Sequence, residues 1–94
     1  MKMLRAAGLV NVTSGAGEHV PGDAIHEMGG ARMGRDPATS VLNAHNQAHD
    51  VANLFVTDGA AMASSACQNP SLTYMALTAR ACDYAVTQLR EGAL

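Results

Sequence analysis

Large aromatic side chains are almost absent from this chain of 94 residues, which has no tryptophan, one phenylalanine and two tyrosines. Apolar residues still make up 48% of the sequence, and most of them are Ala, Val, Leu and Met. A chain this short buries a modest share of its surface, and small side chains give it a thin core. The composition therefore predicts a segment that packs against further protein.

Charge is also scarce, and the net charge of -2 gives no electrostatic basis for binding nucleic acid or an anionic membrane. No apolar run approaches the roughly 20 residues that a transmembrane helix needs. The first apolar stretch is interrupted by Arg5 and stops at Asn11, too soon for a signal-peptide core. The two cysteines, Cys67 and Cys82, are too few for a disulfide framework and are expected to be free. The cellular compartment is left open.

The expected organisation has two parts, an N-terminal helix and loop over residues 1–23 and a functional segment over residues 24–94. The apolar pattern predicts a first helix over residues 1–9. Short strands are expected at residues 24–28, 41–42 and 54–57. The last is the clearest strand, because aromatic and β-branched residues precede a turn at Asp58-Gly59. The fold class is therefore α/β, in the form of an α+β fragment with a few short strands.

A long C-terminal helix is predicted from about Pro70 to about Arg90. Asn69 is suited to the N-cap, and Pro70 to the first helical position. Apolar residues at intervals of three and four build one face, which we expect to pack against a sheet. That face consists of Leu72, Met75, Ala76, Ala79, Cys82, Val86 and Leu89.

The strand that ends in Asp58-Gly59 is followed by a loop of small residues and then by this helix. A carboxylate at the end of a strand can accept hydrogen bonds from ribityl or ribose hydroxyls. Gly59 lets a ligand approach the backbone, and the start of the helix offers free N–H groups to an anion. The combination is typical of a nucleotide-type cofactor site, whereas Asp-Gly alone favours an ordinary turn.

His26 precedes a glycine pair and has no metal-ligand partner at the usual spacing. An imidazole near neutral pH can take the proton of a hydroxyl whose carbon loses a hydride. On its own, His26 favours the interpretation as a structural histidine over a catalytic one. Asn69 likewise has two readings, since it could cap the helix or present its amide to a substrate oxygen.

His45 and His49 are four residues apart and would share one face of a helix, where they could bind a metal. Their segment lacks helical periodicity, and no further ligands complete a set. A solvated loop is the favoured interpretation, and no metal site is expected. A small metal-binding protein therefore stays a minor alternative.

Several motifs together resemble the C-terminal segment of the glucose–methanol–choline (GMC) family of flavin oxidoreductases. The family pattern is a His-x-x-Gly motif ending in Met-Gly, an Asp-Pro turn, an Asn-Leu strand ending in Asp-Gly, and Asn-Pro-x-Leu-Thr at the last helix. The matching stretches, in that order, are His26 to Gly34, Asp36-Pro37, Asn53 to Ala60, and Asn69 to Thr73. Within the family the chain is most similar to bacterial sugar and gluconate dehydrogenases.

The resemblance implies roles for individual residues. His26 and Asn69 fall at the two active-site positions, and the implied reaction is oxidation of an alcohol or sugar with hydride transfer to flavin N5 and His26 as proton acceptor. The implied cofactor is FAD. Its contacts would come from the Asp-Gly turn and the helix start, that is from Asp58, Gly59, Ala60, Asn69, Pro70 and Thr73.

The chain departs from the family pattern at Gly30, where Thr is usual, and at Ala60, where Ser is usual. The larger departure is that no Gly-x-Gly-x-x-Gly fingerprint precedes a strand and a helix. The expected partners are therefore a missing N-terminal FAD-binding portion, a small alcohol or sugar substrate and an electron-acceptor subunit. The chain would belong to a larger two-domain fold and would be inactive alone. The alternative is a non-catalytic fragment or interaction module.

Overall fold

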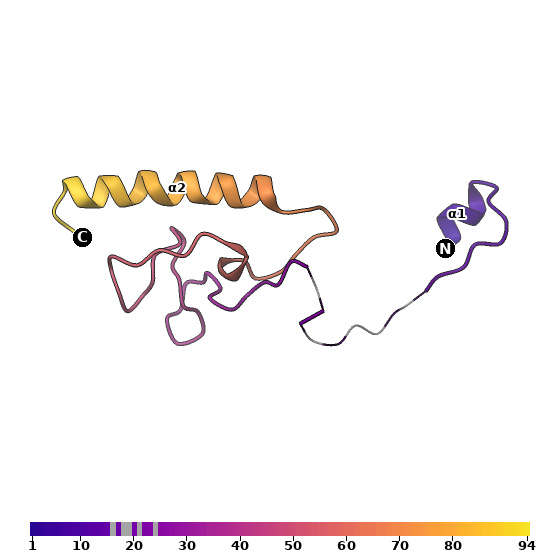
Figure 1. The fold of residues 1–94 in the computed structure, drawn as a ribbon, viewed down its shortest axis with the longest axis horizontal. Coiled ribbons are helices and arrows are strands. Elements are labelled where there is room, and N and C mark those ends of the chain that lie inside the picture. Colours follow the sequence, from indigo (N-terminus) through magenta and orange to yellow (C-terminus); the bar gives the residue numbers. More distant parts are fainter. Residues whose placement is uncertain (16, 18–19, 21, 24) are drawn as a thin grey trace.

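The computed structural model describes residues 1–15, 17, 20, 22–23 and 25–94, and helices are the regular elements within them. They are α1 (Lys2–Ala6), the short 3-10 helix η1 (Gly59–Ala61) and α2 (Ser71–Arg90). Figure 1 shows α2 lying along the coil that precedes it, with α1 at the far end of the molecule. The fold is thus one long helix packed on an irregular chain.

The N-terminal helix is shorter than the expected 1–9, since α1 ends at Ala6 and none of its residues is buried. Gly8 has a φ of 86°, a left-handed conformation that suits the end of a helix. A helix this short gains little from its own hydrogen bonds and here gains nothing from packing.

The predicted C-terminal helix is confirmed as α2, but its start differs from the prediction. Pro70, not Asn69, is the N-cap residue, and the backbone N–H of Tyr74 donates to the Pro70 carbonyl at 3.0 Å. The expectation that Asn69 caps the helix is wrong. Its side chain instead bonds to a residue from a distant part of the chain, described below.

The expected strands appear within the described residues only as isolated β-bridges, so the α/β class is not confirmed. Leu42 bridges Met33 in parallel and Ala48 in antiparallel fashion, and Gln47 bridges Phe55 in antiparallel fashion. Residue 24 of the strand expected at 24–28 lies outside the described residues, and residues 25–28 form no ladder. A strand needs a neighbour along its length, and these segments have one for only a residue or two.

The small core lies within the coil that precedes α2. Leu42, Ala48 and Ala61 are buried there, with Leu42 and Ala61 fully enclosed. Asn46 is also fully buried, and its side chain donates to the Val56 carbonyl at 2.9 Å. Its φ of 63° is a left-handed conformation that Asn tolerates better than most residues.

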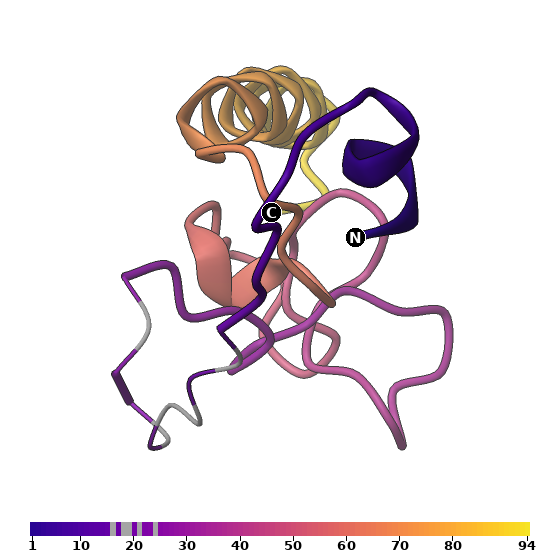
Figure 2. The same ribbon diagram turned by 90° about the vertical axis from the view of Figure 1, so that its right-hand side faces the viewer.

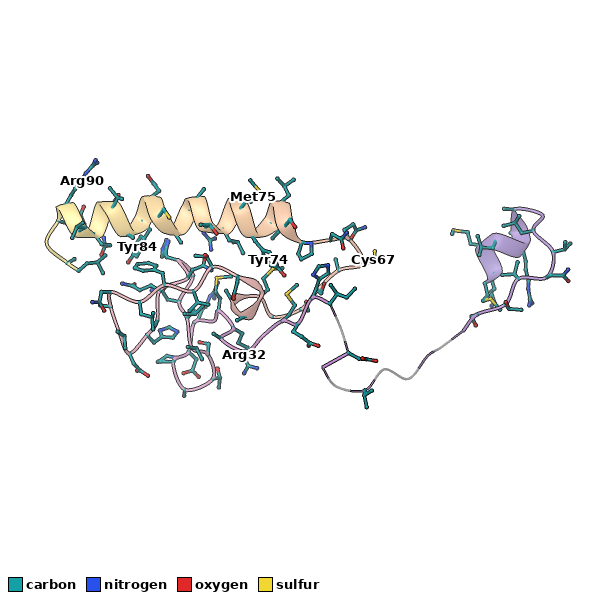
Figure 3. The ribbon with its side chains drawn as sticks, in the orientation of Figure 1. Arg32, Cys67, Tyr74, Met75, Tyr84 and Arg90 are labelled. Carbon is teal, nitrogen blue, oxygen red and sulfur yellow. The ribbon has the colours of Figure 1, made fainter. Side chains whose placement is uncertain are left out.

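Three side chains of α2 hold the helix onto the coil, as Figure 3 shows for the two tyrosines. Tyr74 donates to the Met28 sulfur at 3.5 Å, and Arg80 donates to Oδ1 of Asn46 at 3.1 Å. The Tyr84 ring stacks on His45 with a centroid distance of 4.1 Å. The helix is therefore fixed at three points between its first turn and Tyr84.

The apolar face expected to be packed is not the face that contacts the coil. Leu72, Met75 and Leu89 are 79%, 68% and 66% exposed, and Figure 3 shows Met75 pointing away from the coil. The side toward the coil is a different stripe of buried and half-buried residues, Tyr74, Leu77, Thr78, Ala81, Tyr84, Ala85 and Gln88. No helix among the described residues is long and apolar enough to cross a membrane.

Candidate functional site

The structure brings together the two residues that the sequence assigned to catalysis. Nε2 of His26 lies 2.9 Å from Oδ1 of Asn69, a hydrogen bond between side chains 43 residues apart. His26 is half-buried in the loop before the glycine pair, and Asn69 is exposed directly before the start of α2. A titratable ring and an amide thus meet at the end of the helix that carries the positive dipole.

Gly59 sets how closely the histidine segment approaches α2. A Cβ placed on this buried glycine would lie 2.8 Å from the Glu27 carbonyl oxygen and 2.8 Å from the Tyr74 hydroxyl. It would also lie 3.2 Å from the Met28 sulfur. The two residues that follow His26 therefore pack between η1 and the first turn of α2, and only glycine leaves them room.

The histidine motif and the Asp-Gly motif run side by side. The backbone N–H groups of Ala31 and Met33 each donate at 2.9 Å, to the carbonyls of Ala60 and Ala61 respectively. The N–H of Gly29 donates to the Gly59 carbonyl at 3.4 Å. The two motifs, which are separate in the sequence, form one structural unit at the site.

Asp58 is exposed, and one of its carboxylate oxygens accepts the backbone N–H of Ala60 at 3.0 Å. This bond caps η1, so the carboxylate is held in a fixed direction at the surface. The hydrogen-bonding groups of Ala60 are already engaged, its N–H by Asp58 and its carbonyl by Ala31. In the Asp-Gly turn, the Asp58 carboxylate can therefore still accept hydrogen bonds from a ligand.

The start of α2 offers hydrogen-bond donors next to this pair of motifs. Its first turn has no acidic residue and no side-chain cap. Within the described chain, the N–H groups of Ser71, Leu72 and Thr73 have no acceptor. Pro70 is buried and Thr73 is exposed, so the turn is anchored on one side and open on the other. Uncapped N–H groups at a helix start favour an anion or a polarised carbonyl.

The two histidines weighed as metal ligands have other roles. His45 stacks on Tyr84, while Nε2 of His49 lies 3.1 Å from the Ser40 hydroxyl and 3.2 Å from the Gly34 carbonyl. Across residues 1–15, 17, 20, 22–23 and 25–94, no group of three His, Cys, Asp or Glu side chains is arranged to hold a metal ion. The two free cysteines, Cys67 and Cys82, are both exposed.

Sequence reasoning missed Tyr74 and Asn46, which hold the site without belonging to its motifs. Tyr74 closes the packing around Gly59, and Asn46 links the core coil to α2 through Arg80. Neither has a local signal in the sequence, because each acts through a contact with a distant segment.

Known proteins match this chain over the region that contains the motifs of the site. The sequence model for the C-terminal domain of the GMC oxidoreductases matches residues 8–78, more than half of the chain. The chain belongs to the GMC oxidoreductase family. Its resemblance to that family is therefore confirmed, and GMC oxidoreductases are in general flavoproteins.

Among curated family members, 2-methyl-1,2-propanediol dehydrogenase of Mycolicibacterium austroafricanum is 44% identical over 80 residues. That match covers 85% of this chain and 14% of the dehydrogenase. The fructose dehydrogenase large subunit of Gluconobacter japonicus is 43% identical over 67 residues, covering 71% of this chain and 12% of the subunit. A cholesterol oxidase of Acinetobacter baumannii is 37% identical over 59 residues, covering 63% and 11%.

The chain therefore spans about a seventh of the length of the first of these relatives. No solved structure gives a significant match to the chain. These GMC relatives are oxidoreductases whose names point to alcohols, sugars or sterols, and this segment corresponds to one part of such a protein.

Proposed function

We propose that this chain is the C-terminal part of an FAD-dependent oxidoreductase that acts on CH–OH groups of alcohols or sugars. The observation that carries the proposal is the 2.9 Å contact between His26 and Asn69 at the start of α2. Alcohol oxidation requires a protein group that accepts a proton and a group that holds the substrate oxygen. The imidazole of His26 and the amide of Asn69 can fill these two roles. The family relatives act on related substrates, as their names state.

The proposed reaction breaks two bonds of the substrate and forms one. The alcohol O–H bond releases its proton to His26, the C–H bond on the same carbon releases a hydride, and a C=O bond forms. Bound FAD supplies the acceptor for the hydride at N5. Asn69 holds the substrate oxygen so that the O–H group points at the ring.

The observed pair defines what must change when an alcohol binds. With Oδ1 of Asn69 as its partner, Nε2 of His26 carries the proton and is a donor. For Nε2 to accept a substrate proton, the ring must carry its proton on Nδ1, and Asn69 must present its amide N–H to the alcohol oxygen. Both changes need only a shift of one proton and a turn of one amide, because the side chains already reach each other.

The free groups at the site fit FAD. The exposed carboxylate of Asp58 can accept hydrogen bonds from hydroxyl groups of the cofactor, because only one of its oxygens is hydrogen-bonded to the N–H of Ala60. The uncapped N–H groups of Ser71, Leu72 and Thr73 suit the electron-rich edge of the flavin ring. Asn69 and Pro70 would contact the cofactor from the same helix start, and Gly59 and Ala60 would line it with their small surfaces.

The proposal requires an N-terminal FAD-binding portion as a partner, because the relatives are several times longer than this chain. A small alcohol or sugar is the proposed substrate, and an electron-acceptor subunit is a further proposed partner. The rival proposal is a non-catalytic module, which would keep the fold of this segment without using the His26–Asn69 pair.

The test uses a chimeric enzyme, called the exchange enzyme below. In it, residues 26–94 of this chain replace the matching segment of the M. austroafricanum dehydrogenase. Asp58→Ala should reduce the FAD retained per polypeptide by at least about tenfold, the effect of losing a charged hydrogen-bond acceptor worth roughly 1.5–3 kcal/mol. Retention is measured from flavin absorbance after gel filtration.

Asp36→Ala is the matched control. Asp36 is exposed, and its Oδ1 accepts the N–H of Ala38 at 2.9 Å, the same turn-capping bond that Asp58 makes to Ala60. Both variants lose that cap, but only Asp58 lies at the proposed cofactor site. Equal FAD retention in the two variants would show that Asp58 caps a turn and does not bind the cofactor.

A further inference from the structure

Two side-chain contacts join the histidine segment, residues 26–28, to the start of α2. Nε2 of His26 lies 2.9 Å from Oδ1 of Asn69, and the Tyr74 hydroxyl donates to the Met28 sulfur at 3.5 Å. The first pair is 43 residues apart in the sequence and the second pair is 46 residues apart. Both contacts therefore link the same two stretches of chain, and they act in parallel.

These side chains supply the hydrogen bonds that hold the histidine segment. Within the described chain, the backbone groups of residues 26–28 make no hydrogen bond. The next backbone group along, the Gly29 N–H, donates to the Gly59 carbonyl at a long 3.4 Å, and shorter backbone bonds begin only at Ala31. The position of the His26 ring therefore depends more on side-chain contacts than on backbone ones.

The Tyr74 hydroxyl occupies a confined place. A Cβ placed on Gly59 would lie 2.8 Å from this hydroxyl and 3.2 Å from the Met28 sulfur, so both groups pack against the glycine. Gly59 belongs to η1, which lies beneath the start of α2, as Figure 1 and Figure 2 show. Tyr74 is itself held in the first turn of the helix, where its N–H donates to the Pro70 carbonyl at 3.0 Å. A methionine has three rotatable bonds, so the hydroxyl is the group that fixes the sulfur.

The two contacts differ in what happens to them when an alcohol binds. In the proposed function, Asn69 turns its amide N–H to the alcohol oxygen, and Nε2 of His26 becomes a proton acceptor. The observed bond, in which Nε2 donates to Oδ1, is then lost. The contact between Met28 and Tyr74 involves no group that meets the alcohol, so it can persist. For this step the inference rests on the proposed function.

We propose that Tyr74 is a positioning residue for the oxidation of the alcohol. Through the Met28 sulfur, its hydroxyl keeps the His26 ring beside the substrate oxygen while Asn69 is turned to the alcohol. A general base must lie within about 2.6–3.2 Å of the atom whose proton it takes, and a displacement of about 1 Å can slow a reaction roughly 10²-fold. A thioether sulfur is a weak acceptor, so the loss of this one bond should have a smaller effect, about fivefold to tenfold in rate.

The test is Tyr74→Phe in the exchange enzyme, which removes the hydroxyl and keeps the ring. Anaerobic stopped-flow reduction of the flavin by 2-methyl-1,2-propanediol gives the limiting rate and the substrate concentration at half that rate. The limiting rate should fall by about fivefold to tenfold. The half-saturating concentration and the FAD content should stay unchanged, because Asn69 still holds the alcohol. An unchanged limiting rate at equal FAD content would overturn the inference.

Tyr84→Phe is the matched control on the same helix. The Tyr84 hydroxyl donates to Oε1 of Gln47, also at 3.5 Å, and both tyrosines are half-buried. Each variant thus loses one long hydrogen bond between α2 and the coil, but only Tyr74 contacts the histidine segment. The limiting rate of the Tyr84→Phe enzyme should match that of the unsubstituted exchange enzyme. Equal losses in the two variants would show a general loosening of α2 and would contradict the proposal.

Variants of Met28 test whether Tyr74 acts through the sulfur. Met28→Leu removes the acceptor and should slow flavin reduction as much as Tyr74→Phe does. The double variant should be no slower than either single one, since both substitutions remove the same bond. Met28→Gln offers an amide oxygen to the hydroxyl, so its flavin should be reduced several times faster than that of Met28→Leu. Additive losses in the double variant, or equal rates for the Gln and Leu variants, would count against the proposal.

The 94-residue chain provides a second measurement that needs no flavin. Asn69→Ala removes the first contact, and proton NMR then reports whether the second contact persists. The nuclear Overhauser signals between the Met28 methyl group and the Tyr74 ring should keep the intensity that they have in the unsubstituted chain. Their loss would overturn the inference, whatever the activity of the exchange enzyme.

The inference and the proposed function fail in different ways. If His26→Ala slows flavin reduction and Tyr74→Phe does not, the positioning role is wrong and the proposed function stands. If neither substitution slows reduction, the proposed function is wrong, and the positioning role falls with it.

Discussion

Gly59 is the single residue whose chemistry most constrains the site. Gly59→Ala places a methyl group 2.8 Å from the Glu27 carbonyl oxygen, which is backbone and cannot move without its neighbours. We expect the substitution to lower the free energy of unfolding by about 1–3 kcal/mol, the usual cost of overpacking. Urea unfolding of the chain, followed by the circular dichroism of α2, measures it.

Gly30→Ala is the control for that change. The nearest atom to a Cβ at Gly30 is the Ala60 Cβ at 3.9 Å, an ordinary contact, and Gly30 lies on the same pair of motifs. Its unfolding curve should overlay that of the unsubstituted chain. A Gly59→Ala chain as stable as the Gly30→Ala chain would refute the close packing described around Glu27 and Tyr74.

At this scale the sequence predicted a pair of residues that the structure brings together, but it did not predict the packing around them. His26 and Asn69 were assigned through the family resemblance, and they meet at 2.9 Å. Gly59 was expected to let a cofactor approach the backbone, and the structure adds a second reason for glycine there, the close approach of Glu27 and Tyr74. Such close approaches depend on segments far apart in the sequence, so no local pattern reveals them.

Among the elements, α2 depends on a few contacts with the coil. Tyr84→Ala removes the stack on His45 and the edge contact with Phe55, whose centroid lies 6.4 Å away. We expect the free energy of unfolding to fall by about 2 kcal/mol, from lost aromatic pairing and lost burial. The measurement is the same urea titration.

Met75→Ala serves as the comparison on the same helix. Met75 is 68% exposed and points away from the coil, so its truncation should change stability by less than about 0.5 kcal/mol. Similar losses in the free energy of unfolding for Met75→Ala and Tyr84→Ala would mean that α2 packs through the face that carries Met75, contrary to the structure.

The helix was predictable and the strands were not, for one physical reason. An α-helix completes its hydrogen bonds within its own segment, so periodicity and the Asn-Pro start located α2 within a residue or so. A strand completes them with a neighbour, and among the described residues the 54–57 segment has a neighbour on one edge only. The apolar stripe of α2 was read correctly as apolar, but which part the coil covers depends on the tertiary packing.

The whole molecule is a helix on a thin coil, and this agrees with its composition. Its enclosed core centres on Leu42, while large apolar side chains stay exposed along α2 and over residues 1–10. Folded segments with this balance are marginal alone and gain stability when a partner covers the apolar surface. The GMC relatives, which are several times longer, provide the natural context for such a segment.

The central claim is that His26 takes the proton of an alcohol in an enzyme completed by an N-terminal FAD-binding portion. The most direct test is anaerobic stopped-flow reduction of the flavin in the exchange enzyme, with 2-methyl-1,2-propanediol as substrate. His26→Ala should slow reduction by roughly 10²–10⁴-fold, the usual contribution of a general base, while the FAD content stays unchanged. An unchanged reduction rate at equal FAD content would contradict the claim.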